Sequence, residues 1–306
     1  MQKTVLSFYV DDTNAHIAPP SAFKTFLDFV SAEGAAGESS VILGYDWAGH
    51  GHLQFPGIDN QDTYIEQVQR AYSCGVDSHC ELYTHFRRFD FHENRMPEGA
   101  IHEGLWLYEP TVSLAEYESY FGSILSAGEQ LGIRLSGLTW PGCGCPACSQ
   151  RYQELRDAGI NDPNPNVWQA LLNLARSGRF RGRSVPCFFG GELEVAQAQQ
   201  MAGDGRYGVF TLPPNAGDHF GIWLNDPGRV NADYYITADG QSGRLVELVR
   251  AQVPYCLFFT HWQGLNPVNG VGWDAFTQVI RRVQRYLGGQ VEWMRPSQYT
   301  DSLLST

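Results

Sequence analysis

Short apolar runs alternate along the chain with segments in which apolar residues recur every three or four positions. The runs predict β-strands, and the recurring segments predict helices with one buried face. In the segment 21–34, for example, Phe23, Phe26, Leu27 and Val30 fall on one helical face before a glycine. The pattern predicts strands over 4–10, 39–47, 79–86, 133–140, 184–191, 207–212, 233–238 and 254–262, and helices over 21–34, 62–75, 113–132, 167–178, 192–203, 243–252 and 273–288.

This alternation defines the expected fold class. Seven or eight strands that alternate with helices favour a parallel barrel over an open sheet. No internal repeat, low-complexity tract or long linker interrupts the series. We therefore predict an α/β protein in which residues 1–306 form a single-domain distorted (β/α) barrel of about seven or eight parallel strands. The segment 87–110 lacks a clean period, and we expect it to form an irregular part of the rim.

Composition and charge narrow the range of partners. The formal net charge of −12 argues against nucleic acid and against anionic membrane surfaces, because both need a basic face. No apolar run is long enough to cross a bilayer, and no export signal is recognisable, so we expect a cytoplasmic protein without a membrane partner. The seven cysteines are too few for a disulfide scaffold. The sequence makes no prediction about the oligomeric state.

Polar and aromatic residues follow the predicted strands. In a parallel barrel the active site lies at the carboxyl ends of the strands. Paired aspartates can divide the work between a metal ligand and a base, and neighbouring imidazoles would extend them to a hydrolytic metal site with an open position for water. Exposed aromatic rings beside polar groups suit sugar rings. The residues that follow strands include Asp11 and Asp12, Glu81 and His85, Trp140 and Pro141, and His261, Trp262 and Gln263.

The order of these motifs resembles that of the polysaccharide deacetylases, carbohydrate esterase family 4, and their chitin deacetylase-like relatives. The stretch SFYVDDTN resembles the first motif of this family, ELYTH resembles the second, LTWPGC the third and CLFFTHW the last. The resemblance implies a distorted (β/α) barrel, with Asp11 as general base, Asp12 and His85 as metal ligands, and His261 as general acid. Pro141 would match the residue that forms a wall of the groove.

The second motif of the family continues with another histidine, and Phe89 occupies that position here. The arginine of the third motif is also missing. The stretch EGAIH repeats the Glu-x-x-x-His spacing, and we rank His102 ahead of His92 and His79 as the remaining ligand. Loss of the metal, with a sugar-binding groove retained, stays open.

The predicted activity is that of a metal-dependent carbohydrate-active hydrolase that removes acetyl groups from N- or O-acetylated sugars. The cofactor is a divalent metal, expected to be zinc, and the substrate is a carbohydrate. Trp47, Trp106, Trp140, Trp262, Pro141 and Gln263 are the predicted substrate-binding residues. Two alternatives remain: a glycoside hydrolase that uses paired Asp and Glu without a metal, and a non-catalytic glycan-binding barrel.

Three cysteines, Cys143, Cys145 and Cys148, follow the fourth predicted strand. Their spacing suits a structural zinc, a local disulfide or free thiols, and the sequence does not decide among these three.

Overall fold

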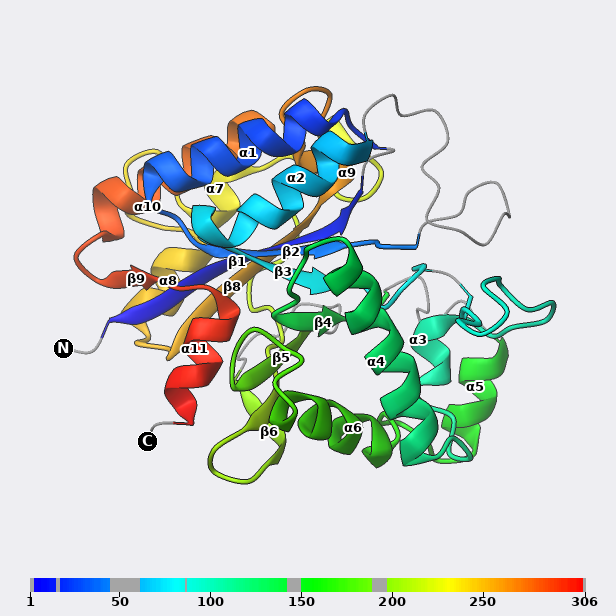
Figure 1. Cartoon of the computed structure of the whole chain (residues 1–306). Coiled ribbons are helices and arrows are strands. Elements are labelled where there is room, and N and C mark those ends of the chain that lie inside the picture. Colours follow the sequence, from blue (N-terminus) through cyan, green and yellow to red (C-terminus); the bar gives the residue numbers. More distant parts are fainter. Residues whose placement is uncertain are drawn as a thin grey trace.

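The computed structural model describes residues 3–14, 17–44, 61–85, 87–141, 150–188 and 197–304. Its centre is a curled, mostly parallel sheet in the order β6-β7-β5-β4-β3-β2-β1-β8, with β9 paired to the start of β1. Helices cover the outer face of this sheet (Figure 1). The strands are β1 (Thr4–Thr13), β2 (Gly37–Val41), β3 (Val76–Cys80), β4 (Gly137–Thr139), β5 (Ser184–Phe188), β6 (Gln199–Gly203), β7 (Gly208–Thr211), β8 (Tyr255–His261) and β9 (Val291–Trp293).

Several helices bury the apolar face that the sequence pattern predicts. In α4 (Leu114–Gln130), Ser113 and Glu116 form a capping box, while Tyr117, Phe121 and Leu125 are buried. The longer helices are α1 (Pro20–Glu33), α2 (Gln61–Ala71), α5 (Gln150–Asp157), α6 (Pro165–Arg176), α8 (Arg244–Arg250), α10 (Trp273–Leu287) and α11 (Pro296–Leu303). Short turns are η1 (Tyr72–Cys74), α3 (Glu103–Trp106), η4 (Pro227–Arg229), α7 (Ala232–Tyr235) and α9 (Trp262–Leu265).

The two ends of the sheet approach each other beyond β7. The backbone amides of Asn215 and Ala216 donate to Leu257 of β8, and Ala216 forms a parallel bridge with Phe258. The Asn215 side chain continues this pairing, because its Nδ2 donates to the Tyr255 carbonyl and its Oδ1 accepts from the Leu257 amide. The predicted α/β class and distorted (β/α) barrel are therefore confirmed.

Alternate residues of the strands line two different cores. Phe8 points outward and packs against Phe26 and Phe276 of the covering helices, with ring centroids 5.8 and 5.7 Å away. Tyr9 points into the barrel and stacks on Phe188 of β5 at 4.8 Å. Because successive side chains of a strand face opposite sides, the inward row of β1 continues from Tyr9 to Asp11 and brings this carboxylate to the top of the barrel interior.

Two predicted elements are wrong. The segment 233–238 was predicted as a strand from its aromatic and β-branched residues, but Asn231 caps a short helix there by accepting from the amide of Tyr234. The segment 192–203 was predicted as a helix, but its described end forms β6, an exposed edge strand antiparallel to β7. Capping in the first case and strand pairing in the second outweigh the local sequence preference.

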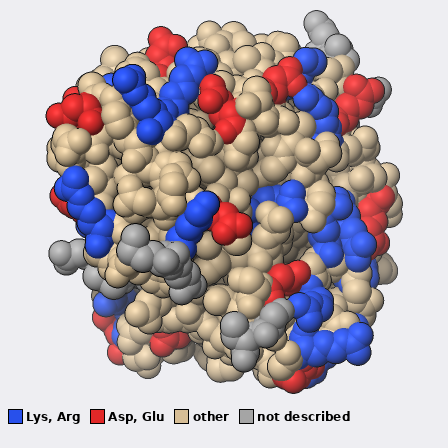
Figure 2. All heavy atoms as spheres, turned by 90° about the vertical axis from the view of Figure 1, so that its left-hand side faces the viewer, with Lys and Arg blue, Asp and Glu red and all other residues tan. Residues whose placement is uncertain are grey.

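The far end of the barrel, at the amino ends of the strands, has a mixed surface charge. Figure 2 shows Lys and Arg interspersed with Asp and Glu over this face. Below it, α11 packs on β5, and Asp301 accepts hydrogen bonds from the Ser184 amide and hydroxyl at 2.8 and 2.6 Å. Among the described helices, none is long and apolar enough to span a membrane.

Candidate active site

Asp11 and Asp12 lie near the carboxyl end of β1, at the carboxyl edge of the sheet, and both are about nine-tenths buried. Asp11 continues the inward row of the strand, whereas Asp12 has a φ of 59°, in the left-handed region that non-glycine residues rarely adopt. This turn is held because the Asp12 amide donates to Ser40 Oγ at 3.1 Å and to Glu81 Oε2 at 3.2 Å. The strained turn thus brings both neighbouring carboxylates to the same site.

Glu81 and His85 approach the pair from the segment after β3. The two Glu81 oxygens divide their contacts: Oε1 lies 2.6 Å from His85 Nδ1, and Oε2 lies 3.1 Å from Ser40 Oγ. The other imidazole nitrogen, His85 Nε2, lies 3.5 Å from Asp12 Oδ1. The φ of 65° at His85 shows that this turn is also held in a left-handed conformation.

Glu103 supports the turn that carries His85. Its side chain is fully buried and accepts hydrogen bonds from the amides of Tyr83 and Thr84 at 3.2 and 2.9 Å, and from the Tyr120 hydroxyl. Burial raises the pKa of Glu103 to about 7, although these hydrogen bonds oppose the shift. Glu103 is therefore a buried anchor for the turn, not a carboxylate open to substrate.

His261 and Asp218 approach from the opposite side. His261 ends β8 and pairs with Asp11 across the sheet; its Nδ1 lies 2.8 Å from Asp218 Oδ2, and its Nε2 lies 3.9 Å from Asp11 Oδ2. Asp218 is fixed because it also accepts from the backbone amides of His261 and Phe220 and from the Thr260 hydroxyl. Burial lowers the pKa of His261, but the Asp218 hydrogen bond and the charge of Asp11 outweigh it and raise this pKa to about 9.

The carboxylates carry more negative charge than the site can hold unaided. Burial raises the pKa of Asp11, and the charge of Asp12 adds to this shift. Burial raises the pKa of Glu81 well above its usual value, and the charge of Asp11 adds to it. Ser40 Oγ lies 2.9 Å from Asp11 Oδ1 and 3.1 Å from Glu81 Oε2, yet its single hydrogen can serve only one of them. A proton or a cation is needed to balance the group.

The donor set is suited to a metal ion. Ligand atoms of Asp12, Glu81 and His85 lie within 4.8 Å of one another, and this is the group of metal-ligating side chains that the described part of the chain brings together. Two carboxylate oxygens and one imidazole nitrogen match the ligands that zinc and similar divalent ions accept. The residues present therefore fit a divalent metal, with Glu81 in addition to the expected Asp12 and His85.

The structure brings five predicted site residues together: Asp11, Asp12, His85, His261 and Gln263, whose Nε2 donates to Asp12 Oδ2 at 2.9 Å. His102 lies beside the group and not within it, because its Nδ1 accepts from the Gly104 amide at 3.1 Å and its ring interacts with the backbone of His85. Burial lowers the pKa of His102 to about 4. Pro141 lies next to it, close enough to Gly104 that an added Cβ there would lie 3.1 Å from the Pro141 carbonyl oxygen.

Three of the four predicted tryptophans lie in the core, away from this group of side chains. Trp262 packs edge-on against Phe23 and Phe26 in the core, Trp140 packs against Trp168, and Trp106 packs against Tyr117 and Tyr120. These three tryptophans are at most 5% exposed, so their ring faces contact protein and we assign them no sugar-stacking role. Trp47 and the cysteines Cys143, Cys145 and Cys148 lie outside the described residues.

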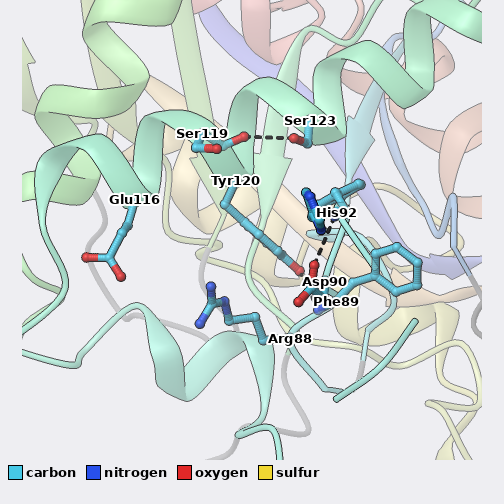
Figure 3. Close-up of a pocket in the computed structure, with 9 residues that line it drawn as sticks. Arg88, Phe89, Asp90, His92, Glu116, Ser119, Tyr120 and Ser123 are labelled. Carbon is cyan, nitrogen blue, oxygen red and sulfur yellow. Dashed lines mark hydrogen bonds between the residues drawn. The ribbon is translucent and has the colours of Figure 1, made fainter. Parts of the chain in front are cut away.

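Phe89, which occupies the position of a motif histidine, is buried among aromatic rings. Its ring centroid lies 4.9 Å from that of Tyr83 and 5.1 Å from that of Phe91. It borders a small hollow of about 200 Å³ over α4, in which Tyr120 and Arg88 also take part (Figure 3). None of the residues lining this hollow belongs to the Asp12–Glu81–His85 group. Position 89 is thus a core position in this fold.

Sequence reasoning missed three contributors. Glu81 was noted at the rim but was not assigned as a ligand, although it stands four residues before His85. Ser40 gives a usable signal, because Glu38 and Ser40 place polar side chains at alternate positions of a buried strand. Asp218 gives little signal, since it lies in a loop seven residues beyond the end of β7.

Fold and site together define a (β/α)-barrel protein with a carboxylate–imidazole centre at the carboxyl ends of its strands. No protein-family profile and no curated protein matches the sequence. Among solved structures, a T48 deacetylase with substrate aligns over 98% of this chain and 92% of its own, at 10% identity and a TM-score of 0.44. A polysaccharide deacetylase from Bacillus cereus aligns over 96% and 92%, at 12% identity and a TM-score of 0.42.

A pneumococcal exo-β-D-N-acetylglucosaminidase module aligns over 93% of this chain and 84% of its own, at 11% identity and a TM-score of 0.44. These likenesses concern the fold alone.

Proposed function

We propose that this protein is a carbohydrate-active hydrolase that removes an acetyl group from an N- or O-acetylated sugar, with a divalent metal, zinc, at Asp12, Glu81 and His85. The observation that carries this proposal is the placement of the Asp11–Asp12 pair between two imidazoles, each held by a buried carboxylate. The solved deacetylases with a similar fold are consistent with this class of activity but do not carry the argument.

The residues divide into three roles. Asp12, Glu81 and His85 would hold the metal, and His102, beside His85, is a further candidate ligand. When bound, the metal would supply an activated water and polarise the acetyl carbonyl. Asp11 is oriented by Ser40 and would accept the proton from water, as a general base does.

His261 would return a proton to the leaving sugar nitrogen or oxygen. Its Nδ1 is engaged by Asp218, so the proton available for transfer is on Nε2, the nitrogen that faces Asp11. A raised pKa keeps this imidazole protonated at neutral pH, as a general acid requires. The proposed base, Asp11, and the proposed acid, His261, thus occupy paired positions on the adjacent strands β1 and β8.

The glycoside hydrolase alternative fits this geometry less well. A glycosidase needs two carboxylates about 5–10 Å apart on opposite sides of the scissile bond. Asp11 and Glu81 instead share the hydroxyl of Ser40, and Asp11 and Asp12 are adjacent in the chain. Ligand atoms of Asp12 and Glu81 also lie within 4.8 Å of one another, which suits one shared cation better than a pair that flanks a bond.

The test combines metal analysis with product analysis. We expect the purified protein to hold about one divalent ion per chain, to release acetate from acetylated oligosaccharides, and to lose both properties in Asp12→Ala. The matched control is Asp162→Ala, which removes an exposed carboxylate that is not part of the site. It should retain both the metal and the release of acetate. Absence of metal together with unchanged activity in Asp12→Ala would refute the proposal. Release of reducing ends instead of acetate would favour the glycosidase, and binding without either product would favour a non-catalytic glycan-binding barrel.

A further inference from the structure

Two loops at the rim of the site expose a cluster of apolar side chains. Trp223 and Leu224 are 58% and 56% exposed, and Val268 and Val271 are 58% and 36% exposed. Among the large apolar side chains that the described part of the chain leaves exposed, the remaining one, Met201, lies on β6. We call Trp223, Leu224, Val268 and Val271 the apolar rim patch. Scattered single apolar residues are normal on a surface, but four on two adjoining loops call for an explanation.

The two loops are joined by one amide side chain. Asn225 Nδ2 donates to the Asn269 carbonyl at 3.0 Å, and Asn225 Oδ1 accepts from the Val271 amide at 2.9 Å. Gly221 packs so closely that an added Cβ would lie 2.6 Å from Val271 Cγ2. These contacts fix the two loops, and hence the two parts of the patch, relative to each other.

The conformation of the first loop turns Trp223 outward. Ile222 and Asn225, which flank Trp223 and Leu224, have φ values of 51° and 52°. A left-handed conformation is costly for a β-branched residue such as isoleucine, and persists only where the surroundings hold it. Here the Asp226 amide closes the loop by donating to the Gly221 carbonyl at 2.8 Å. The fold thus maintains a strained loop whose tip presents an indole ring to solvent.

The same loops carry two residues of the candidate active site. Asp218, which holds His261, begins the loop that leads to Trp223, and Gln263, which donates to Asp12, begins the segment that leads to Val268. The loops meet beside the site, because an added Cβ at Gly264 would lie 2.9 Å from the Ile222 carbonyl oxygen. The helix α9 that contains Gln263 and Gly264 lies at the carboxyl ends of β1 and β8 (Figure 1). The loops that present the patch are therefore the loops that also carry Asp218 and Gln263 of the site.

We propose that the apolar rim patch is a distal sugar-binding subsite, in which the Trp223 ring stacks on a residue of a glycan chain that extends from the acetylated sugar at Asp11 and Asp12. This inference rests on the proposed function for the identity of the sugar at the centre. Pyranose rings present apolar C–H faces that match an exposed indole. A neutral glycan is also not repelled by a chain of net charge −12.

A second copy of the chain is a poorer occupant. Four side chains, two of them valines, expose much less surface than the total of about 1,200 Å² that stable protein interfaces bury. Two copies would also bring together net charges of −12 each. A sugar ring needs only a small apolar face of this kind, and the loops that present it also carry Asp218 and Gln263 of the site.

The test compares chain lengths in Trp223→Ala and in the control Met201→Ala, which removes an exposed apolar side chain outside the patch. The probes are β-1,4-linked N-acetylglucosamine oligomers of two and six residues, with affinity measured by calorimetry and acetate release measured separately. We expect Trp223→Ala to weaken binding of the hexamer about tenfold, with little change for the dimer. We expect Met201→Ala to match the wild type for both.

The outcomes separate the two proposals. Trp223-dependent binding of the hexamer without acetate release supports the subsite and refutes the proposed deacetylation. Acetate release with identical binding of both oligomers by wild type and Trp223→Ala refutes the subsite alone. Failure of the wild type to bind the hexamer more tightly than the dimer also refutes it. A change of oligomeric state in Trp223→Ala, seen by sedimentation, would show that a second copy covers the patch and would overturn the inference.

Discussion

The two sides of the Asp11–Asp12 pair use the same device, an imidazole held by a buried carboxylate, but they differ in what surrounds the carboxylate. Asp218 accepts from two backbone amides, one hydroxyl and the His261 ring. Glu81 contacts one backbone amide, that of Asp12, and the His85 ring, but it shares the hydroxyl of Ser40 with Asp11 and lies within the field of both aspartates. The first environment satisfies its negative charge with fixed donors, whereas the second leaves charge uncompensated.

This difference indicates what each side is suited to hold. On the His261 side the charge is balanced by hydrogen bonds, so the imidazole can retain a proton for transfer. On the His85 side the carboxylates of Asp11 and Glu81 share one hydroxyl, and the carboxylate of Asp12 lies beside His85, so a divalent cation would balance the three charges. Two chemically similar couples therefore differ in role, and substitutions on each side should give different signatures.

The largest effect is expected where both sides meet. In Asp11→Asn the amide keeps the shape of the side chain but loses the ability to accept a proton from water. We expect kcat for acetate release to fall by about 10²–10⁴-fold, which is the range for loss of a general base. Metal content, measured by elemental analysis, should remain near that of the wild type, because Asp11 is not a proposed ligand. Loss of metal from Asp11→Asn would instead place this carboxylate on the cation.

The next largest effect is expected on the His85 side, where the proposed cation would bind. Glu81→Gln keeps the size of the side chain but removes a negative charge and a strong contact to His85. We expect metal affinity to fall by at least about 10–100-fold, the range for loss of a residue that holds or orients a ligand. Because burial disfavours the charged form of Glu81, the metal-free variant should melt at or above the temperature of the metal-free wild type. Unchanged metal affinity, measured by competition with a chelator, would contradict the role of Glu81.

Substitution on the His261 side should change the pH dependence of kcat. The pKa of His261 is about 9, above the value near 6.5 of a free histidine, so the folded state favours the protonated imidazole. Its contribution to stability is fully present below pH 6.5 and is lost as the pH rises through about 9. Asp218→Asn removes a main cause of the raised pKa, so the alkaline limb of the kcat profile should move to lower pH. An alkaline limb that stays in place would show that His261 is not the acid.

The sequence predicted the fold class, and it singled out several of the side chains that the structure brings together, for physical reasons. The periodicity of strands and helices is a local property of the sequence. The pattern alone therefore predicted helices at α1 and α4, and it placed Asp11, Asp12 and His261 at the carboxyl ends of strands. Asp218 could not be placed, because its position beside His261 depends on the path of a loop and on the pairing of Asn215 with β8. Trp223 was also not singled out, since exposure of a loop residue depends on tertiary packing and not on spacing.

The smallest effect is expected at Gln263, which begins the segment that leads to the apolar rim patch and donates a hydrogen bond to Asp12. Gln263→Ala removes one hydrogen bond to Asp12 Oδ2, a contact to a charged group that contributes about 1.5–3 kcal/mol when buried and less when partly exposed. We expect kcat/KM to fall by about 3–10-fold, with the pH profile unchanged, because the His261–Asp218 couple is untouched. A shift of the alkaline limb in Gln263→Ala would mean that the two sides of the Asp11–Asp12 pair are coupled through this amide and do not act as separate units.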